Sequence, residues 1–429
     1  MESVLSSGED FLVGPLDYGS VGKDQAQYIQ ERRQTTIFAS VPEAGPNSVR
    51  TVKFNVSDPN GFLDLSTLMF AWDVVEKSTT KPLQPLTAIP HCCWSRLVVR
   101  VSNALVEDLG GGGGSFARTE EMLSRFMSFE KRRNMANMGF GLTSSSAQGD
   151  DHIARPISSG LLNRGKMLPA LLLGAGGLTF ELEVPEASEI VRTHTDDSST
   201  FTYENMTCIV DSVRLTSELT EQYSSMLLSG RSIMIPYQTF DCSLQHLTSQ
   251  TGSHTLNIAK QYTRLSTMFC SLDQEETLPP AAADVAAIKA SHVNNFYLPH
   301  AEAQNVESFI SINNKRWPDF NSKGVAQHWN RLNRGLGTMS SIAHGTNIGD
   351  VAWGAVSGTN ATSFTFLWDL DKAAHHGASS SGENVTTGGL VSLHLKNVGS
   401  AGASPTRAYI CALYDAVLEL VDTGARVYT

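Results

Sequence analysis

The sequence predicts an all-β protein built from two tandem β domains, and three observations support this. Only 17% of its 429 residues are charged, and Val, Thr, Phe and Tyr recur in short runs between turn residues, a composition typical of strands. The chain is long enough for two domains of about 200 residues that each bury a full core. One strand-like pattern also occurs once in each half. We therefore expect an N-terminal arm over residues 1–50, a first domain over 51–229 and a second over 230–429.

Residues 1–50 are polar, with Pro and Gly spaced through them and no sustained hydrophobic period. Such a segment has too few apolar residues for a core of its own and is typical of an arm. Within it, residues 25–33 have the pattern of a short helix. We expect an arm of this kind, where it is ordered, to lie on a partner.

The first domain begins where apolar residues start to alternate with polar ones. Val52, Phe54 and Val56 follow this pattern, and the turn Asp58-Pro59-Asn60-Gly61 separates them from an apolar run, as in a β-hairpin. Five consecutive glycines later precede an amphipathic helix. The predicted elements are strands over 51–56, 62–75, 94–109, 167–173 and 176–184, a helix over 117–131, and a long surface loop over 139–165.

The stretch 206–240 joins the two halves as strand, helix and strand. Residues 206–215 alternate with apolar weight on both faces, a Thr216 or Ser217 hydroxyl can cap the next helix, and Gly230 ends it. Proline cannot donate to a strand ladder, so Pro236 predicts a sheet edge or a bulge. We place the seam between the two domains here, and its predicted residues are Leu219, Tyr223, Met226, Leu227 and Pro236.

The second domain contains the same kinds of element in its sequence. Its apolar runs are again short and separated by turn residues, which indicates strands. One longer segment with Trp329 and Leu332 on one side indicates a helix. The predicted strands lie over 254–272, 307–312, 363–370, 388–395 and 407–421, the helix over 324–336, and the connections over 278–290 and 375–384.

A short pattern recurs in both halves. Residues 176–184, GGLTFELEV, match residues 388–396, GGLVSLHLK, in the leading glycine pair and in the phase of the apolar residues. After a polar loop, each is followed by a long strand, over 208–215 and 408–420. Two copies a domain length apart favour duplication of one β domain, and a chance likeness of two short strands is the alternative.

Charge and cysteine content narrow the function classes. The net charge is −11, which argues against a surface that wraps nucleic acid, because phosphate binding needs clustered Lys and Arg. The six cysteines are scattered without CxxC spacing, which predicts reduced, buried thiols. Residues 1–14 lack the pattern of a signal peptide, and the longest apolar stretch, 167–173, is too short to span a bilayer. We expect a protein made inside the cell and not secreted.

No catalytic, cofactor-binding or metal-binding motif is found. The glycine run 110–114 is not followed by Gly-Lys-Ser/Thr, and 335–337 lacks the third glycine of a dinucleotide turn. The pair His375-His376 has no neighbouring ligand at metal-site spacing, so a solvated pair is the simpler interpretation. We predict no cofactor, no metal and no enzyme activity.

The order of these elements resembles that of the double jelly-roll major capsid proteins of adenovirus-like, polinton-like and related DNA viruses. The resemblance covers residues from about 50 to the end, and it depends on the order and spacing of several landmarks. These landmarks are residues 61–66, the strand 97–109 before a helix, the stretch 206–240, the segment 310–318, and the strand pair 389–396 and 408–420.

The resemblance implies two tandem eight-stranded jelly rolls with short accessory helices and long loops. It also implies a structural protein that forms homotrimers, which serve as pseudo-hexameric capsomers and tile an icosahedral shell. The implied partners are neighbouring capsomers, penton and minor capsid proteins and an internal membrane, with no sequence-specific nucleic acid. The implied location is the virion. Helices 117–131 and 217–229 would lie beside or between the rolls, and loops 139–165, 278–306 and 371–386 would form towers or intersubunit contacts.

Two other functions stay open from the sequence. A tandem β-sandwich that binds or cleaves carbohydrate needs aromatic side chains in a groove with paired carboxylates, and Trp317, Trp329, Trp353 and Trp368 are the candidates. A cellular interaction module with two sandwiches is the third possibility. Exposure of these tryptophans and the oligomeric state of the protein distinguish the three.

Overall fold

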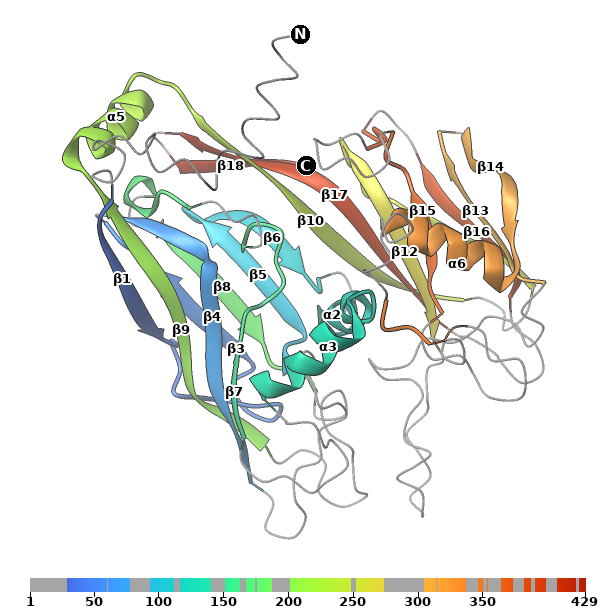
Figure 1. Cartoon of the computed structure of the whole chain (residues 1–429), viewed down its shortest axis with the longest axis horizontal. Coiled ribbons are helices and arrows are strands. Elements are labelled where there is room, and N and C mark those ends of the chain that lie inside the picture. Colours follow the sequence, from blue (N-terminus) through green and yellow to red (C-terminus); the bar gives the residue numbers. More distant parts are fainter. Residues whose placement is uncertain are drawn as a thin grey trace, which may run out of the picture.

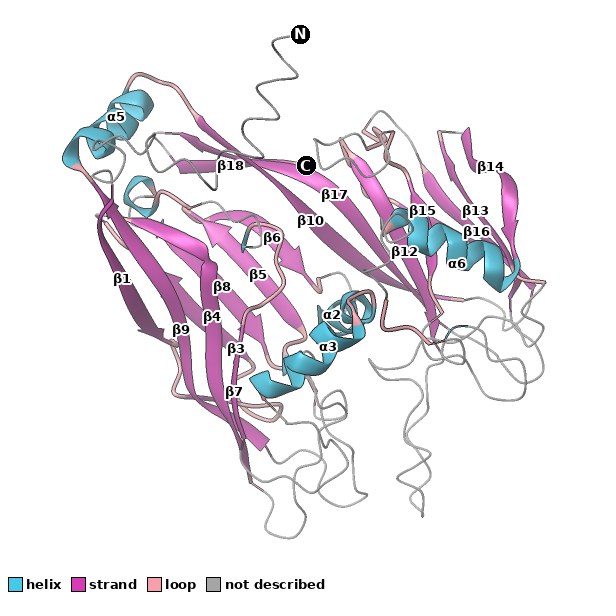
Figure 2. Ribbon diagram, viewed as in Figure 1, coloured by secondary structure: helices cyan, strands magenta, loops and turns pink. Residues whose placement is uncertain are grey.

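Strands make up most of the computed structural model, and its helices are few and short (Figure 2). The structure describes residues 29–59, 61–77, 93–111, 116–139, 151–162, 167–173, 176–186, 201–247, 252–273, 305–313, 315–336, 346–349, 353, 364–372, 382–386, 390–398, 407–421 and 424–429.

The first roll consists of two antiparallel sheets that pack face to face. One sheet has the order β1 (Ile29–Phe38), β9 (Phe201–Leu215), β4 (Phe62–Glu76) and β7 (Asp151–Arg155), with β2 (Glu43–Ala44) paired to β9. The other has the order β3 (Thr51–Val56), β8 (Leu178–Glu183), β5 (Arg96–Val101) and β6 (Ala104–Leu109).

The second roll has the same plan. Its first sheet has the order β10 (Ile233–His246), β17 (Arg407–Val421), β12 (Leu265–Asp273) and β15 (Phe366–Asp369), with β18 (Gly424–Tyr428) paired to β17. Its second sheet has the order β11 (Gly252–Ile258), β16 (Val391–Val398), β13 (Glu307–Ile312) and β14 (Lys315–Lys323).

The strand order of the two rolls is the same, position by position. β8 and β16, the two copies of the repeated pattern, occupy the second place in their sheets and are each followed by the central strand, β9 or β17. This is the jelly-roll arrangement of two four-stranded sheets, so the predicted fold class is confirmed. In the described part of the chain, strands β1–β9 pair only with one another, as do β10–β18. The change of roll falls between β9 and β10, and the exact domain limits stay a prediction.

Alternation of side chains explains why these segments form facing sheets. In β3, every second residue is buried, and the opposite sheet contributes Phe70 to the same core. The rings of Phe54 and Phe180 each meet Phe70 edge to face, at 5.2 and 5.4 Å between centroids. Such pairs add about 0.5–1.5 kcal/mol each to the burial of the rings.

The hairpins follow the turn chemistry of their residues. Between β5 and β6, Ser102 and Asn103 both have positive φ, 48° and 67°, which is the two-residue turn that suits the twist of a hairpin. Asn313, in the equivalent hairpin between β13 and β14, has φ of 51°. Asparagine adopts this conformation more readily than most residues.

Several helices were predicted correctly, and one was predicted as too long. α5 (Ser217–Leu228) and α6 (Gly324–Gly335) fall where the sequence places them. The expected helix 117–131 is two helices, α2 (Phe116–Arg125) and α3 (Phe129–Asn134). The break occurs because Ser128 starts α3 as its N-cap, accepting a hydrogen bond from the Lys131 amide at 3.4 Å.

The N-terminal arm is a correction. Residues expected in an arm over 1–50, and in a helix over 25–33, include β1 and β2, which pair with the central strand β9. The first roll therefore begins by residue 29 and not at 51. β1 escaped prediction because it is an edge strand whose side chains are mostly exposed, so its sequence carries no apolar period.

Two further segments differ from prediction. The expected loop 139–165 contains strand β7 and the buried residues Ile157, Leu161 and Leu162. The expected strand 167–173 makes a single bridge, Leu63 to Leu168, and then a 3-10 turn η5 (Ala170–Leu172). The connection 278–290 and the pair His375-His376 lie outside the described residues.

We expect the Phe180→Ala variant to lose about 3–5 kcal/mol of unfolding free energy, because it leaves a cavity beside Phe54 and Phe70. Urea denaturation followed by tryptophan fluorescence measures this. Leu390→Ala is the matched control, since Leu390 is 52% exposed, and it should change the unfolding free energy by less than about 0.5 kcal/mol. Equal effects of the two variants would contradict this packing.

Candidate functional site

One side of the first roll packs against one side of the second roll, and this contact is the candidate functional surface of the chain. The first roll contributes β6, α2 and the segment 157–162, and the second roll contributes its sheet β10–β17–β12. Figure 1 shows α2 between the body of the first roll and the strands β10, β17 and β12. β6 lies against β10 and β18.

Helix α2 is buried along almost its whole length, although it is rich in charge. All of its residues except Leu123 are buried, including two arginines and two glutamates. Glu120 accepts from Arg155 at 2.7 Å, and Glu121 accepts from Arg125 at 2.7 Å and from Arg132 at 3.0 Å. Each buried carboxylate is thus neutralised within the first roll, which offsets the cost of its desolvation.

The opposite side of α2 contacts the second roll through one hydroxyl, one cation and one ring. The hydroxyls of Thr119 and Tyr409 are hydrogen-bonded. The Arg118 guanidinium lies over the Tyr409 ring, 5.5 Å from its centroid, at cation–π distance. Just beyond the helix, Phe126 stacks on Phe269 with 5.4 Å between centroids.

The second roll receives α2 on a row of small and aromatic side chains. Phe269, Cys411 and Cys242 are cross-strand neighbours on β12, β17 and β10, and all three are buried. Thr119 donates to the Cys242 sulfur at 3.0 Å. Burial raises the pKa of the Cys411 thiol, so this group stays protonated and is a poor nucleophile. The five cysteines that the structure describes are all buried and free, as predicted.

The edge of β6 contributes a buried carboxyl group. Glu107 is 3% exposed, accepts from the Ser159 hydroxyl and, at 3.3 Å, from the Leu161 amide. Desolvation raises the pKa of Glu107 above its usual value. Beside it, the Tyr237 hydroxyl of β10 donates to the Val106 carbonyl at 3.0 Å. The second roll thus satisfies the Val106 carbonyl on the edge strand β6 through the Tyr237 hydroxyl.

The loop 157–162 approaches β10 so closely that it needs a glycine. A Cβ atom at Gly160 would lie 1.9 Å from the Gln238 carbonyl oxygen. Because that obstacle is backbone in a central part of the interface, it cannot move aside at low cost. Gly160 therefore sets the distance between the rolls at this point.

The predicted seam residues lie at the end of the first roll, where β9 passes through α5 into β10 (Figure 1). Tyr223 is 38% exposed and packs edge to face on Phe62 at 5.5 Å. It lines a hollow of about 180 Å³ together with Ile233 and Met234 at the start of β10. Leu219 is partly buried.

Pro236 is exposed on β10, an edge strand of its sheet, which agrees with the edge predicted from proline. The side chains of Met226 and Leu227 lie outside the described residues. A seam role for Leu219, Tyr223, Met226, Leu227 and Pro236 stays a prediction. The resemblance placed the helix 117–131 beside or between the rolls, and α2 lies there (Figure 1). Its contacting residues, β6 and 157–162 were not predicted, because a helix with four charges in ten residues has the sequence of an exposed helix.

Each of the two surfaces that meet between the rolls has an equivalent surface in the other roll. No described residue of the other roll covers that equivalent surface. In the first roll, the row Met69, Ile209 and Thr36 crosses β4, β9 and β1, the strands equivalent to those that receive α2. Met69 and Ile209 are half-buried and Thr36 is exposed. In the second roll, β14 and α6 are equivalent to β6 and α2, and they present Phe320, 86% exposed, and Trp317, 47% exposed.

These open surfaces lie on opposite sides of the molecule. Figure 1 shows β1 along one outer edge of the molecule and β14 along the other. In both rolls, the sheet that begins with β1 or with its equivalent β10 therefore faces the same side of the molecule. The arrangement is head to tail, since the helix-bearing side of one roll meets the sheet face of the next.

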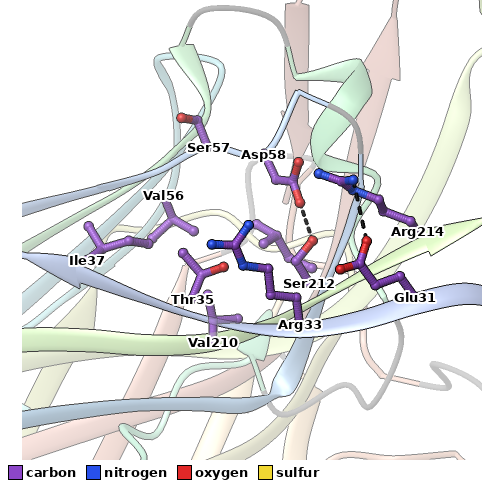
Figure 3. Close-up of a pocket in the computed structure, with 11 residues that line it drawn as sticks. Glu31, Arg33, Thr35, Ile37, Val56, Ser57, Asp58, Val210, Ser212 and Arg214 are labelled. Atoms are coloured by element: carbon purple, nitrogen blue, oxygen red, sulfur yellow. Dashed lines mark hydrogen bonds and ion pairs between the residues drawn. The ribbon is translucent and has the colours of Figure 1, made fainter.

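A polar hollow of about 210 Å³ opens beside β1 in the first roll (Figure 3). Ser212 donates to the Asp58 carboxylate, and Glu31 pairs with Arg214 at 3.4 Å. The residues that line the hollow include no histidine, so Ser212 has no imidazole base beside it to activate it as a nucleophile.

Three of the four tryptophans considered for carbohydrate binding belong to the interior. Trp368 and Trp353 are 1% and 6% exposed, and Trp329 packs edge to face on Trp353 at 4.9 Å. Trp317 alone of the four is substantially exposed. The described residues contain no group of three or more His, Cys, Asp or Glu placed to hold a metal ion. No helix in the described part of the chain is long and apolar enough to cross a bilayer.

No protein-family model and no curated protein matches the sequence. Solved structures do match the fold. PBCV-1 VP54, fitted into a reconstruction of the virophage Sputnik, superposes with a TM-score of 0.65 at 12% identity, over 96% of this chain and 99% of that one. The Faustovirus major capsid protein gives 0.62 at 7% identity, over 95% and 93%, and the mavirus major capsid protein gives 0.50 at 9%, over 96% and 94%.

These likenesses extend over nearly the whole of each chain. They show that this protein has the double jelly-roll fold found in viral major capsid proteins, as the order of its sequence landmarks predicts.

Glu107 predicts a pH dependence of stability. Because its pKa is raised in the folded state, the unfolded chain loses this proton first as the pH rises above about 4.5, and the unfolding free energy falls by up to about 1.4 kcal/mol per pH unit. Glu107→Gln should remove this fall when urea unfolding is repeated between pH 4.5 and 8. Glu218→Gln, at an exposed position, should keep the slope of the wild type. A Glu107→Gln slope equal to that of the wild type would contradict a protonated Glu107.

Gly160→Ala should weaken the contact between the rolls, because its Cβ collides with the Gln238 carbonyl. We expect a loss of about 1–3 kcal/mol, as for other overpacked sites, together with faster hydrogen exchange of the Leu161 and Leu162 amides. Gly349→Ala is the control, since nothing lies within 4 Å of a Cβ there. An unchanged Gly160→Ala protein would show that the loop does not set the spacing.

Proposed function

We propose that this chain is the major structural protein of an icosahedral virus shell and that it acts as a homotrimer. One observation carries the proposal. The chain contains two equivalent rolls joined head to tail, and the two surfaces of that joint recur on opposite sides of the molecule (Figure 1), where no described part of the other roll covers them.

A head-to-tail contact repeats until it closes into a ring or extends as a filament. Within one chain, the side of the first roll that carries β6 and α2 meets the sheet β10–β17–β12. The side of the second roll that carries β14 and α6 would meet the sheet β1–β9–β4 of the next chain in the same way. Three chains supply six rolls, so the closed ring has a nearly sixfold outline with threefold symmetry. A unit of this outline can tile a flat facet.

The exposed side chains support assembly at these ends. Phe320, 86% exposed, and Trp317, 47% exposed, lie on the edge strand β14, and aromatic side chains of this kind are enriched in interfaces. Burial of apolar surface contributes about 25 cal/mol per Å², and permanent subunit contacts commonly bury several thousand Å².

The structural comparisons support a role in a shell. The fold also matches the chain of a PBCV-1 virus capsid model, with a TM-score of 0.64 at 13% identity over 96% of this chain. In the proposed shell the trimers contact neighbouring capsomers, and penton and minor capsid proteins complete it. The protein of this virion is made inside the host cell without secretion. Of the four tryptophans considered for carbohydrate binding, only Trp317 is substantially exposed, so the carbohydrate alternative depends on that one residue.

Mass and shape test the proposal together. Purified protein should have the mass of three chains by native mass spectrometry and appear as hexagonal particles in negative stain. Phe320→Asp should give monomers with an unchanged melting temperature, because an unpaired carboxylate in a subunit contact is costly while that side chain contacts solvent in the single chain. Leu390→Asp, at another exposed apolar residue, should still form trimers. A wild type that stays monomeric at high concentration would refute the proposal.

A further inference from the structure

A basic hollow lies on the open end of the second roll. It has a volume of about 350 Å³ and is lined from β14, α6 and the end of β15. Its lining residues are Trp317, Arg331, Arg334, Asp369, Asp371 and Lys372.

The acidic groups of this hollow are engaged within the second roll. One Asp369 carboxylate oxygen accepts from the Asp371 amide at 3.2 Å, and an Asp371 carboxylate oxygen accepts from the Ser266 hydroxyl at 2.9 Å. The Asp369 carbonyl accepts from the Trp317 indole nitrogen at 2.8 Å. These bonds hold the tryptophan ring in place at the wall of the hollow.

The two arginines have no such partners. Among the residues that the structure describes, neither the Arg331 nor the Arg334 guanidinium group makes a hydrogen bond or an ion pair. Burial and then the charge of Arg334 lower the pKa of Arg331, as expected of two guanidinium groups that lie close together without an anion. Lys372 reaches Glu383 at 3.3 Å with most of its side chain exposed.

Helix α6 lacks the acidic residues that its equivalent helix α2 contains. Both helices follow the edge strand of their sheet, β6 or β14. Arg125 of α2 pairs with Glu121 of the same helix at 2.7 Å, and the second roll covers this helix. α6 has the sequence GVAQHWNRLNRG, which contains arginines but no acidic residue. Helix α6 itself therefore supplies no anion for its arginines.

The open face of the first roll has the complementary charge. Asp64 and Asp211 are direct cross-strand partners on β4 and β9, with side chains 14% and 16% exposed. Like charges directly opposite one another destabilise a strand pair. Arg32 alone is shared between them, at 2.7 Å from Asp211 and 3.6 Å from Asp64, so the cluster keeps one net negative charge.

We propose that the hollow formed by Arg331, Arg334 and Trp317 binds the Asp64 and Asp211 carboxylates of a second copy of this chain. This rests on the proposed trimer and names the charged contact that sets its order and direction. The hollow and the two carboxylates lie on the two open surfaces, which are equivalent to the two surfaces that meet between the rolls inside the chain. Charged contacts of this kind direct pairing and exclude wrong orientations.

A charge exchange tests the proposal. Arg331→Glu with Arg334→Glu should raise the protein concentration needed for half-assembly by about tenfold or more in sedimentation velocity. Combining these changes with Asp64→Arg and Asp211→Arg in one chain should restore assembly. Arg331→Lys with Arg334→Lys, which keeps the charge, should assemble closer to the wild type. For the wild type, assembly should weaken as NaCl rises from 0.05 to about 1 M, because salt screens the contact.

Folding and alternative ligands are controlled separately. Circular dichroism melting shows whether each variant is folded, and Arg231→Glu, at an exposed position between α5 and β10, should assemble normally. If wild type and Arg331→Glu/Arg334→Glu form trimers equally well, the inference is overturned while the proposed trimer stands. If the variant assembles normally but loses binding of sialyllactose, a free carboxylated sugar, that the wild type shows, the hollow is a glycan site instead. A monomeric wild type would refute the trimer itself.

Discussion

The contact of α2 with the sheet β10–β17–β12 is the interaction on which the rest of this architecture depends. It requires burial of a helix with four charged residues, which is possible because Glu120 and Glu121 are paired with arginines inside the first roll. Toward the second roll, the helix and the residue that follows it present the Thr119 hydroxyl, the Arg118 guanidinium over the Tyr409 ring, and the stacked Phe126 ring. With both glutamates paired locally, the helix can contact the second roll without leaving a buried carboxylate unpaired.

The two rolls have the same topology but not the same surface. The strand order is identical in the two rolls, so β6 and β14 are equivalent edge strands, and an edge strand must be covered or made unattractive to other strands. The second roll covers β6. No described residue of the first roll covers β14, which carries Pro318 and charged residues among its exposed aromatic side chains. Because β6 is covered by the second roll and β14 is not covered by the first, the two rolls together form a unit with two different sides.

Local pattern predicted most of the fold, and it failed where the determining contacts are distant in sequence. β3, β8, β16 and β17 have strong alternation or long apolar runs, and α5 and α6 have clear ends, so their positions followed from the residues. β1 has exposed side chains and is a strand only because β9, about 180 residues further on, pairs with it. The partners of the α2 charges also include Arg155, 35 residues from Glu120, and no local pattern shows that pairing. The individual contacts of the inter-roll interface were therefore not predictable from the sequence, while the fold class and a helix beside or between the rolls were.

The contrast between the joined and the open faces has a physical reason. The row that receives α2 consists of Phe269, Cys411 and Cys242, all buried, because two rolls of one chain never separate and their contact is made during folding. The open row of Met69, Ile209 and Thr36 is only partly apolar and is bordered by Asp64 and Asp211. A large apolar patch exposed to water would be prone to aggregation. In the proposed trimer, charge at the open surfaces would give direction to the encounter, and the exposed aromatic residues on β14 would add apolar burial once the partner is in place. A permanent contact and an assembly contact can thus use the same geometry with different chemistry.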